Sequence, residues 1–165
     1  MITIRLLTEN DSLEDLTELI HRSYRQLAEM GFRYWGTHQT VEDTKKRVSK
    51  GSRYLGLVDN KIISTVTFYS PGMTDGHPWF EQSGVAKFGQ FAVEPAYQRQ
   101  GIGCTMLDFI ERVAVKMNAD EIACDTAEDA AHLTRMYENR GYRIVGKADW
   151  DITNFKSVIL SKKLK

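Results

Sequence analysis

The chain has 165 residues, which is the usual length of one domain. Hydrophobic residues make up 42% and charged residues 27%, so there is enough apolar material for a core, and the composition excludes a disordered chain. Lysine plus arginine and aspartate plus glutamate number 22 each, so the net charge is zero and the basic excess of a general nucleic-acid binder is absent.

The first residues alternate in hydrophobicity and lack the basic region and apolar run of a signal peptide, and no stretch approaches a membrane span. The two cysteines, Cys104 and Cys124, and the four scattered histidines have no metal-ligand spacing, so we expect no metal site. We therefore expect a cytoplasmic protein with two buried free thiols, and neither nucleic acid nor membrane as a partner.

Hydrophobic periodicity predicts the elements of the first half of the chain. They are a strand over residues 2–7, a helix over 13–30, a helix over 41–49 and strands over 54–58 and 62–69. Ser12, with Asn10 and Asp11, and Thr40 are the residue types that cap helix N-termini. Asp59-Asn60 between the two strands predicts a tight hairpin turn.

In the second half, strands alternate with helices, which predicts a mixed sheet covered by helices. After a long loop over residues 71–84 the predicted elements are a strand over 85–93, a helix over 101–117, a strand over 121–125, a helix over 129–140 and strands over 142–145 and 155–160. Gly141 follows the last helix at the position that favours a left-handed backbone. We expect one domain over residues 1–165.

The segment Gln98–Gly103 lies where a strand, ended by Pro95, leads into a helix. A helix N-terminus offers unpaired N–H groups and a partial positive charge. Gly101 and Gly103 have no Cβ, so a phosphate can approach the backbone closely, and Arg99 could add a charge-assisted bond. This pattern favours a pyrophosphate site.

Other glycine motifs fit this segment less well. A dinucleotide-binding G-x-G-x-x-G would need glycine where Met106 stands, and a P-loop would need Gly-Lys followed by Ser or Thr. A glycine-rich turn that only starts the helix is the alternative that the glycines by themselves leave open.

Gln98, Gly101 and Gly103 match Q/R-x-x-G-x-G/A, and the segment therefore resembles the acetyl-CoA-binding motif of the GNAT acetyltransferases. The lead-in Phe91–Pro95 and the later Tyr137-x-x-x-Gly141-Tyr142 are similar to that family as well. The resemblance implies an α/β (α+β) fold with a mixed, mostly antiparallel sheet of about six or seven strands flanked by about four helices.

The resemblance also implies how acetyl-CoA is held. The backbone of one strand segment would pair with the pantetheine arm: Phe91, Ala92 and Val93. Backbone amides of the turn would hold the pyrophosphate: Gln98, Arg99, Gln100, Gly101, Ile102 and Gly103. Thr105 could add a hydroxyl. Ala130 departs from the family, which often has an asparagine there that contacts the cofactor.

Tyr137 is the candidate general acid for the leaving thiolate, and a core tyrosine with a satisfied hydroxyl is the alternative. The family often places a glutamate on the strand before the glycine motif, but residues 85–93 contain no acid. We therefore name Glu81 as the candidate base, with His77, Asp125 or a chain of water molecules as alternatives.

Phe32, Tyr34 and Trp35 form an aromatic segment that could line an acceptor pocket, or else a minor hydrophobic cluster. The expected activity is transfer of the acetyl group of acetyl-CoA to a primary amine of a small molecule by direct attack in a ternary complex. Acetylation of a protein or peptide and acyl-CoA binding without turnover are the alternatives. The sequence leaves a homodimer open.

Overall fold

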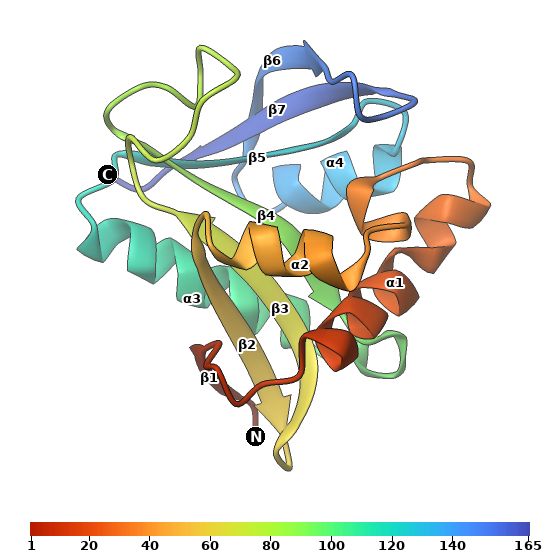
Figure 1. Ribbon diagram of the computed structural model, residues 1–165. Helices are drawn as coiled ribbons and strands as arrows, with labels where there is room; N and C mark the ends of the chain where they lie inside the picture. Colours follow the sequence, from red (N-terminus) through yellow and green to blue (C-terminus); the bar gives the residue numbers. More distant parts are fainter.

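One seven-stranded sheet runs through the computed structural model, which describes residues 1–165, in the order β1-β2-β3-β4-β5-β7-β6 (Figure 1). Its strands are β1 (Thr3–Leu6), β2 (Ser52–Val58), β3 (Lys61–Tyr69), β4 (Val85–Val93), β5 (Glu121–Ala127), β6 (Arg143–Asp149) and β7 (Lys156–Lys163). The helices are α1 (Leu13–Glu29), α2 (Val41–Val48), α3 (Ile102–Lys116) and α4 (Ala131–Glu138), with 3-10 turns at Trp35–Thr37 and Pro95–Tyr97. Only the β4–β5 pair is parallel, so the predicted mixed, mostly antiparallel sheet is confirmed.

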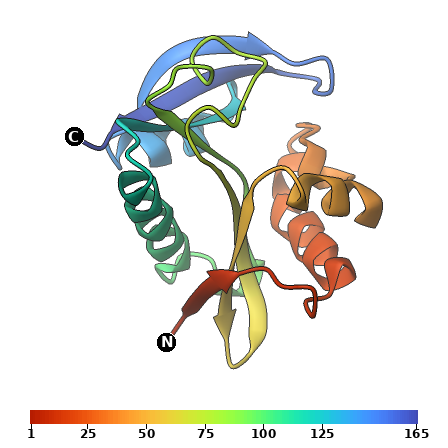
Figure 2. The same ribbon diagram turned by 60° about the vertical axis from the view of Figure 1, so that its left-hand side comes forward.

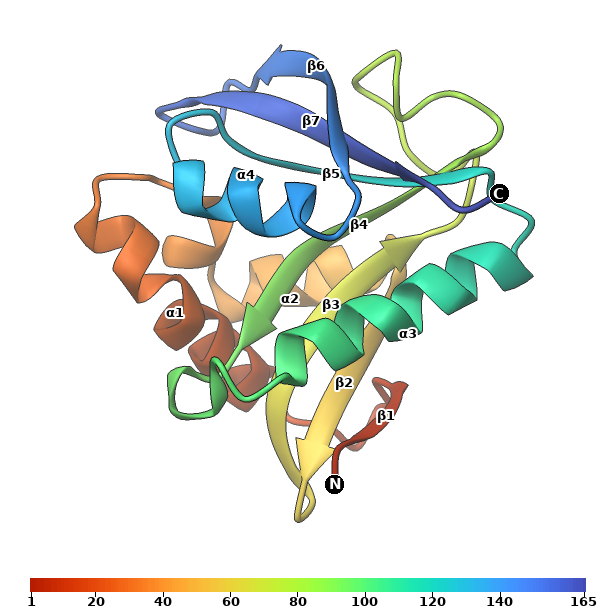
Figure 3. The ribbon, with the colours of Figure 1, turned by 180° about the vertical axis from the view of Figure 1, so that it is seen from behind.

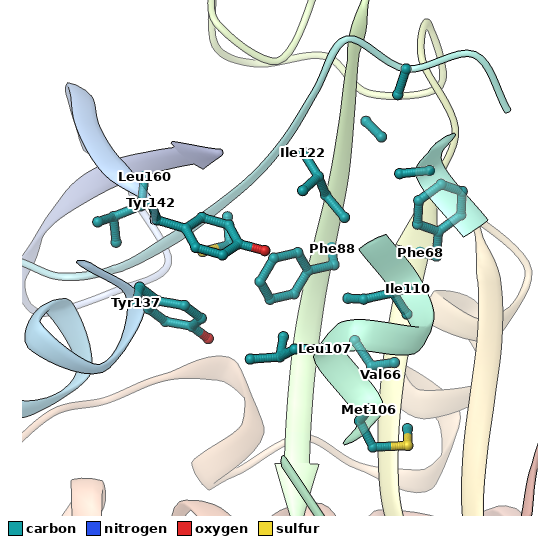
Figure 4. Close-up of a cluster of buried hydrophobic side chains, with 14 of the residues drawn as sticks. Val66, Phe68, Phe88, Met106, Leu107, Ile110, Ile122, Tyr137, Tyr142 and Leu160 are labelled. Atoms are coloured by element: carbon teal, nitrogen blue, oxygen red, sulfur yellow. The ribbon is translucent and has the colours of Figure 1, made fainter. Parts of the chain in front are cut away.

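The helices cover both faces of the sheet. α1 and α2 lie on one face and α3 on the other (Figure 2), and α4 is on the same side as α3 (Figure 3). The largest hydrophobic cluster lies between α3, α4 and the sheet and includes Phe88, Leu107 and Tyr137 (Figure 4). None of the helices has the length and apolar composition that crossing a bilayer requires.

The predicted caps of α1 and α2 and the predicted hairpin turn are confirmed, whereas α4 starts two residues later and ends two residues earlier than predicted. Ser12 accepts a hydrogen bond from the backbone N–H of Asp15, and Thr40 forms a reciprocal capping box with Asp43. Asp59 and Asn60 both have positive φ, 48° and 62°, as a two-residue hairpin turn of mirror-image type requires.

The last three strands are longer than predicted. β5 continues to Ala127, β6 to Asp149, and β7 starts at Lys156 and runs to Lys163. The added residues do not alternate between apolar and polar, so the sequence pattern did not predict them as strand. They are in the strands because they pair with a neighbouring strand. The prediction of two buried thiols is wrong for Cys104, which is exposed in the first turn of α3, and confirmed for Cys124.

β4 and β5 separate soon after they meet. They pair only over Val85–Lys87 with Glu121–Ala123. Further along β4 the register with β3 shifts at a bulge, where Gln90 has a φ of 46°. The remainder of β4 therefore has no strand along the edge that faces β5, and the sheet opens there.

Candidate active site

A cavity of about 680 Å³ occupies the opening between β4 and β5. From the α3–α4 face it is lined by Phe91, Val93, Gly103, Leu133, Met136 and Tyr137. From the α1–α2 face it is lined by residues that include Tyr24, Tyr34, Trp35, Arg47, Tyr69 and Gln90. Because α3 and α1 lie on opposite faces of the sheet (Figure 2), two different molecules could meet in this opening from opposite sides.

The turn before α3 presents a row of free backbone amides. Gly101 caps the helix with a φ of 83° and no side-chain hydrogen bond, and Arg99 also has a positive φ, 57°. The N–H groups of residues 99–101 find no acceptor in the chain, and those of residues 102–104 form the first helical turn, where no intrahelical partner exists. This geometry suits an anion such as a pyrophosphate.

Three polar side chains in this region bind the protein itself. Gln98 donates to the carbonyl of Val93 at 3.0 Å, and Gln100 donates to the carbonyl of Ala96 at 2.9 Å. The Thr105 hydroxyl donates to the Gly101 carbonyl at 3.1 Å. These bonds fix the shape of the turn, so its side chains support the backbone amides that a ligand would use.

Successive side chains at the end of β4 point alternately into the cavity and away from it. Phe91 and Val93 line the cavity, whereas Ala92 is buried against the cluster of α1. The N–H of Val93 already donates to the Ser23 hydroxyl at 3.2 Å. A ligand that paired with this edge would therefore find the Val93 N–H already occupied.

Tyr137 reaches the cavity from α4. Its side chain is only 7% exposed and its ring lies 5.5 Å from that of Tyr142 and 6.0 Å from that of Phe88, centroid to centroid (Figure 4). Burial, with the neighbouring Cys124 as the second cause, raises the pKa of the Tyr137 hydroxyl well above its usual value. The hydroxyl is therefore protonated at neutral pH and available as a proton donor.

The structure places Glu81 and His77 outside the cavity. Glu81 is exposed and accepts a hydrogen bond from the backbone N–H of Gly76 at 3.1 Å. The His77 ring accepts at Nδ1 from the Trp79 N–H and bonds at Nε2 to the Lys147 carbonyl at 3.0 Å, which requires the proton on Nε2. Both residues hold the 71–84 loop in place.

Asp125 on β5 lies inside the cavity. Its Oδ2 accepts a hydrogen bond from the indole N–H of Trp150 at 3.1 Å, and its Oδ1 lies 3.7 Å from the Lys87 ammonium. No three His, Cys, Asp or Glu side chains form a group that could hold a metal ion. Of the carboxylates that sequence reasoning considered, Asp125 is the one that lines the cavity.

Two of the three aromatic residues that follow α1 line the cavity, and the third packs behind them. Tyr34 and Trp35 line the cavity, whereas Phe32 packs behind them against Phe155 at 5.9 Å. The Tyr34 hydroxyl pairs with the Thr126 hydroxyl at 2.7 Å and accepts from the backbone N–H of Ala127 at 2.9 Å. Tyr34 thus ties the segment between α1 and α2 to the end of β5 and closes one side of the cavity.

We expect Tyr34→Phe to lower the free energy of unfolding by about 1–3 kcal/mol, because it leaves the buried N–H of Ala127 without an acceptor. Denaturant unfolding measures this loss. Tyr24→Phe is the matched control, since the Tyr24 ring packs edge-on against Tyr34 at 5.6 Å but its hydroxyl lacks such bonds. Equal stability of the two variants would contradict this role of Tyr34.

Several cavity residues carry no local signal in the sequence. Arg47, Tyr69, Lys87, Trp150 and Phe155 come from α2, β3, β4 and the loop between β6 and β7. They meet only because the order of the strands and the opening at β4 bring these elements together. Sequence reasoning named Asp125 only as an alternative base.

Known proteins of similar sequence and fold point to one family. The model of the Acetyltransferase (GNAT) family matches residues 13–142. The chain is 29% identical over 147 residues to the S-(2-succino)cysteine N-acetyltransferase of Bacillus subtilis (strain 168), covering 88% of this chain and 86% of that protein. It is 24% identical over 153 residues to the S-alkylcysteine N-acetyltransferase of the same organism, covering 89% and 82%. The crystal structure of a GNAT family acetyltransferase from Elizabethkingia anophelis with acetyl-CoA bound is similar in fold, with a TM-score of 0.71, 18% identity and coverage of 98% and 97%.

Proposed function

Because the chain belongs to the GNAT acetyltransferase family, we propose that it transfers the acetyl group of acetyl-CoA to a primary amine of a small molecule, by direct attack in a ternary complex. One observation supports this proposal above the others. A single cavity joins the free amides at the start of α3 to an aromatic pocket on the opposite face of the sheet. A thioester and an amine could therefore meet in the opening between β4 and β5.

The residues at the α3 side fit acetyl-CoA. The free amides of residues 99–104 would hold its pyrophosphate, and the backbone of Phe91 would pair with the pantetheine arm along the open edge of β4. Gly103 lines the cavity, and a Cβ added there would lie 3.4 Å from the ring of Phe91, which lines the cavity as well. Ala130 is buried and caps α4 without a side-chain bond, so its position offers no polar contact to the ligand.

We expect saturating acetyl-CoA to raise the melting temperature. Ligand at about a hundred times its dissociation constant adds about 2.7 kcal/mol to the free energy of unfolding. Melting scans with acetyl-CoA and, at the same concentration, with S-acetylpantetheine, which lacks the pyrophosphate and the nucleotide, measure this. An equal shift with both compounds would contradict the role of the α3 amides.

Two side chains are suited to the proton transfers. The amine nitrogen attacks the thioester carbonyl carbon, the carbon–sulfur bond breaks, and the thiolate leaves with the electron pair. The Tyr137 hydroxyl would give the thiolate its proton. An alkyl amine with a pKa near 10 arrives protonated, and Asp125 would hold its ammonium group and pass one proton to water before the attack. The second proton, which the nitrogen loses after the attack, would restore the Tyr137 hydroxyl through water. We propose Asp125 in place of Glu81, because only Asp125 lies in the cavity.

The acceptor we propose to test first is an S-substituted cysteine, since two relatives are named for N-acetylation of such compounds. The pocket is lined by large apolar side chains that could cover a substituent on sulfur: Leu27, Tyr69, Trp150, Ile152 and Phe155. An apolar wall of this kind recognises size more than chemistry.

Release of the CoA thiol from acetyl-CoA tests the function. The panel contains S-alkylcysteines, simple alkyl amines and short peptides with free N-termini. We expect release with small amines. Release with the peptides alone would show a peptide acetyltransferase, and tight acetyl-CoA binding without release on the whole panel would favour a module that binds acyl-CoA without turnover.

A further inference from the structure

Arg53 on β2 is a buried cation without a counter-ion. It is 2% exposed, and no carboxylate forms an ion pair with it. Its guanidinium donates to the Gln90 side-chain carbonyl at 2.7 Å and weakly to the Thr65 hydroxyl at 3.4 Å, while Nε has no partner. Burial lowers its pKa to about 10, so it remains charged at neutral pH.

The side chains that accept hydrogen bonds from Arg53 are neutral. The Gln90 amide N–H donates to the side-chain carbonyl of Gln39, and the Gln39 amide donates in turn to the Thr44 hydroxyl at 2.6 Å. These bonds orient Gln90 with its carbonyl toward Arg53 and leave one of its amide N–H groups free. Gln90 lines the part of the cavity that faces α1 and α2, where the proposed acceptor would bind. The positive charge of Arg53 directly behind Gln90 therefore acts on that part of the cavity.

A second cation lies at the same wall. Arg47 of α2 lines the cavity, has no ion pair, and places its guanidinium 6.0 Å from the centre of the Trp35 ring. Its positive charge is a further cause, after burial, of the lowered pKa of Arg53. The carboxylates that line the cavity are Asp75, which is exposed, and Asp125, which already has Lys87 as its partner.

We infer that Arg47 and Gln90, with Arg53 behind them, form a subsite for an anionic group of the acceptor, so that the substrate class is amines that also carry a carboxylate. A buried charge is costly unless it is paired, and the acceptor carboxylate would supply the missing counter-charge. Arg47 would donate charge-assisted bonds and Gln90 its free N–H. The inference rests on the proposed acetyl transfer and names the residues that select the acceptor.

The test compares two acceptors that differ only in the carboxylate. An S-alkylcysteine and the corresponding S-alkylcysteamine share the amine and the sulfur substituent. We expect kcat/KM to be about a hundredfold higher for the acceptor that carries the carboxylate. Without the carboxylate the cations of the subsite stay unpaired, and leaving one partner of a buried charge pair alone commonly has an effect of this size. Equal kcat/KM would overturn the subsite while leaving the proposed function intact. No transfer to either compound, while other small amines react, would overturn the subsite alone, and no transfer to any amine would overturn the proposed function as well.

Two variants then assign the preference to residues. Arg47→Met removes the cavity cation, and Gln90→Glu places a carboxylate against Arg53 without removing the buried arginine. In both, the ratio of the two kcat/KM values should fall at least about tenfold. Lys46→Met, on the same helix but outside the cavity, is the control and should keep the ratio of the unaltered protein. An unchanged ratio in both cavity variants, with melting temperatures confirming that they fold, would overturn the assignment.

Discussion

Replacing Gly103 with valine is expected to weaken acetyl-CoA binding by at least about a hundredfold, or about 2.7 kcal/mol, while the protein remains folded. The folded state has room for a side chain, because an added Cβ would lie 3.4 Å from Phe91 and 3.9 Å from Val93, which are ordinary contacts. The branched methyl groups would occupy the cavity wall beside the free amides of the turn, where a pyrophosphate must approach the backbone.

Titration calorimetry with acetyl-CoA, accompanied by a melting scan without ligand, separates lost binding from lost folding. Arg112→Val is the matched control, because it introduces the same side chain at an exposed position of α3 away from the cavity. Undiminished affinity in a folded Gly103→Val variant would mean that the pyrophosphate binds elsewhere.

Tyr137→Phe is expected to lower kcat by roughly tenfold or more and to leave acetyl-CoA affinity nearly unchanged. The substitution keeps the ring in its packing against Phe88 and Tyr142 and removes only the hydroxyl. The effect has a lower bound near tenfold because a thiolate can leave with little help and water can replace the acid. Since burial raises the pKa of Tyr137, its proton is retained up to and beyond the usual value of about 10, so kcat should show no fall from this group between neutral pH and about pH 10.

Tyr142→Phe is the control for this experiment. Tyr142 belongs to the same buried cluster, but its hydroxyl donates to Glu111 at 3.0 Å and does not line the cavity. That variant should lose about 1 kcal/mol of stability without a loss of kcat. Full activity of Tyr137→Phe with every acceptor would remove Tyr137 from the catalytic residues and leave catalysis to positioning.

The fold could be predicted from the sequence where local patterns determine it. The caps at Ser12 and Thr40, the hairpin at Asp59-Asn60 and the glycine turn before α3 are each specified by a few neighbouring residues. The apolar face of its helix predicts that Tyr137 points inward, but its role, like the position of Tyr34 and Trp35 near an acceptor, was expected from the family resemblance.

The acceptor side of the site could not be predicted in this way. The pairing of Arg53 with Gln90 depends on the bulge in β4, and that of Asp125 with Trp150 depends on the path of the loop between β6 and β7. These contacts join residues that are 37 and 25 positions apart, and no periodicity or motif connects them. Glu81 is close in sequence to β4, but it lies outside the cavity, although Asp75 of the same loop lines it, and its carboxylate accepts a hydrogen bond from the Gly76 N–H.

Mass spectrometry of the products formed from acetyl-CoA and an S-alkylcysteine tests the proposed acetyl transfer most directly. We expect the acetyl group on the amine nitrogen of the acceptor and one CoA thiol for each acetylated molecule, with no acetyl group left on the protein, since the amine attacks the thioester itself. An acetylated protein side chain that accumulates before product, or CoA release without an acetylated acceptor, would contradict direct transfer in a ternary complex.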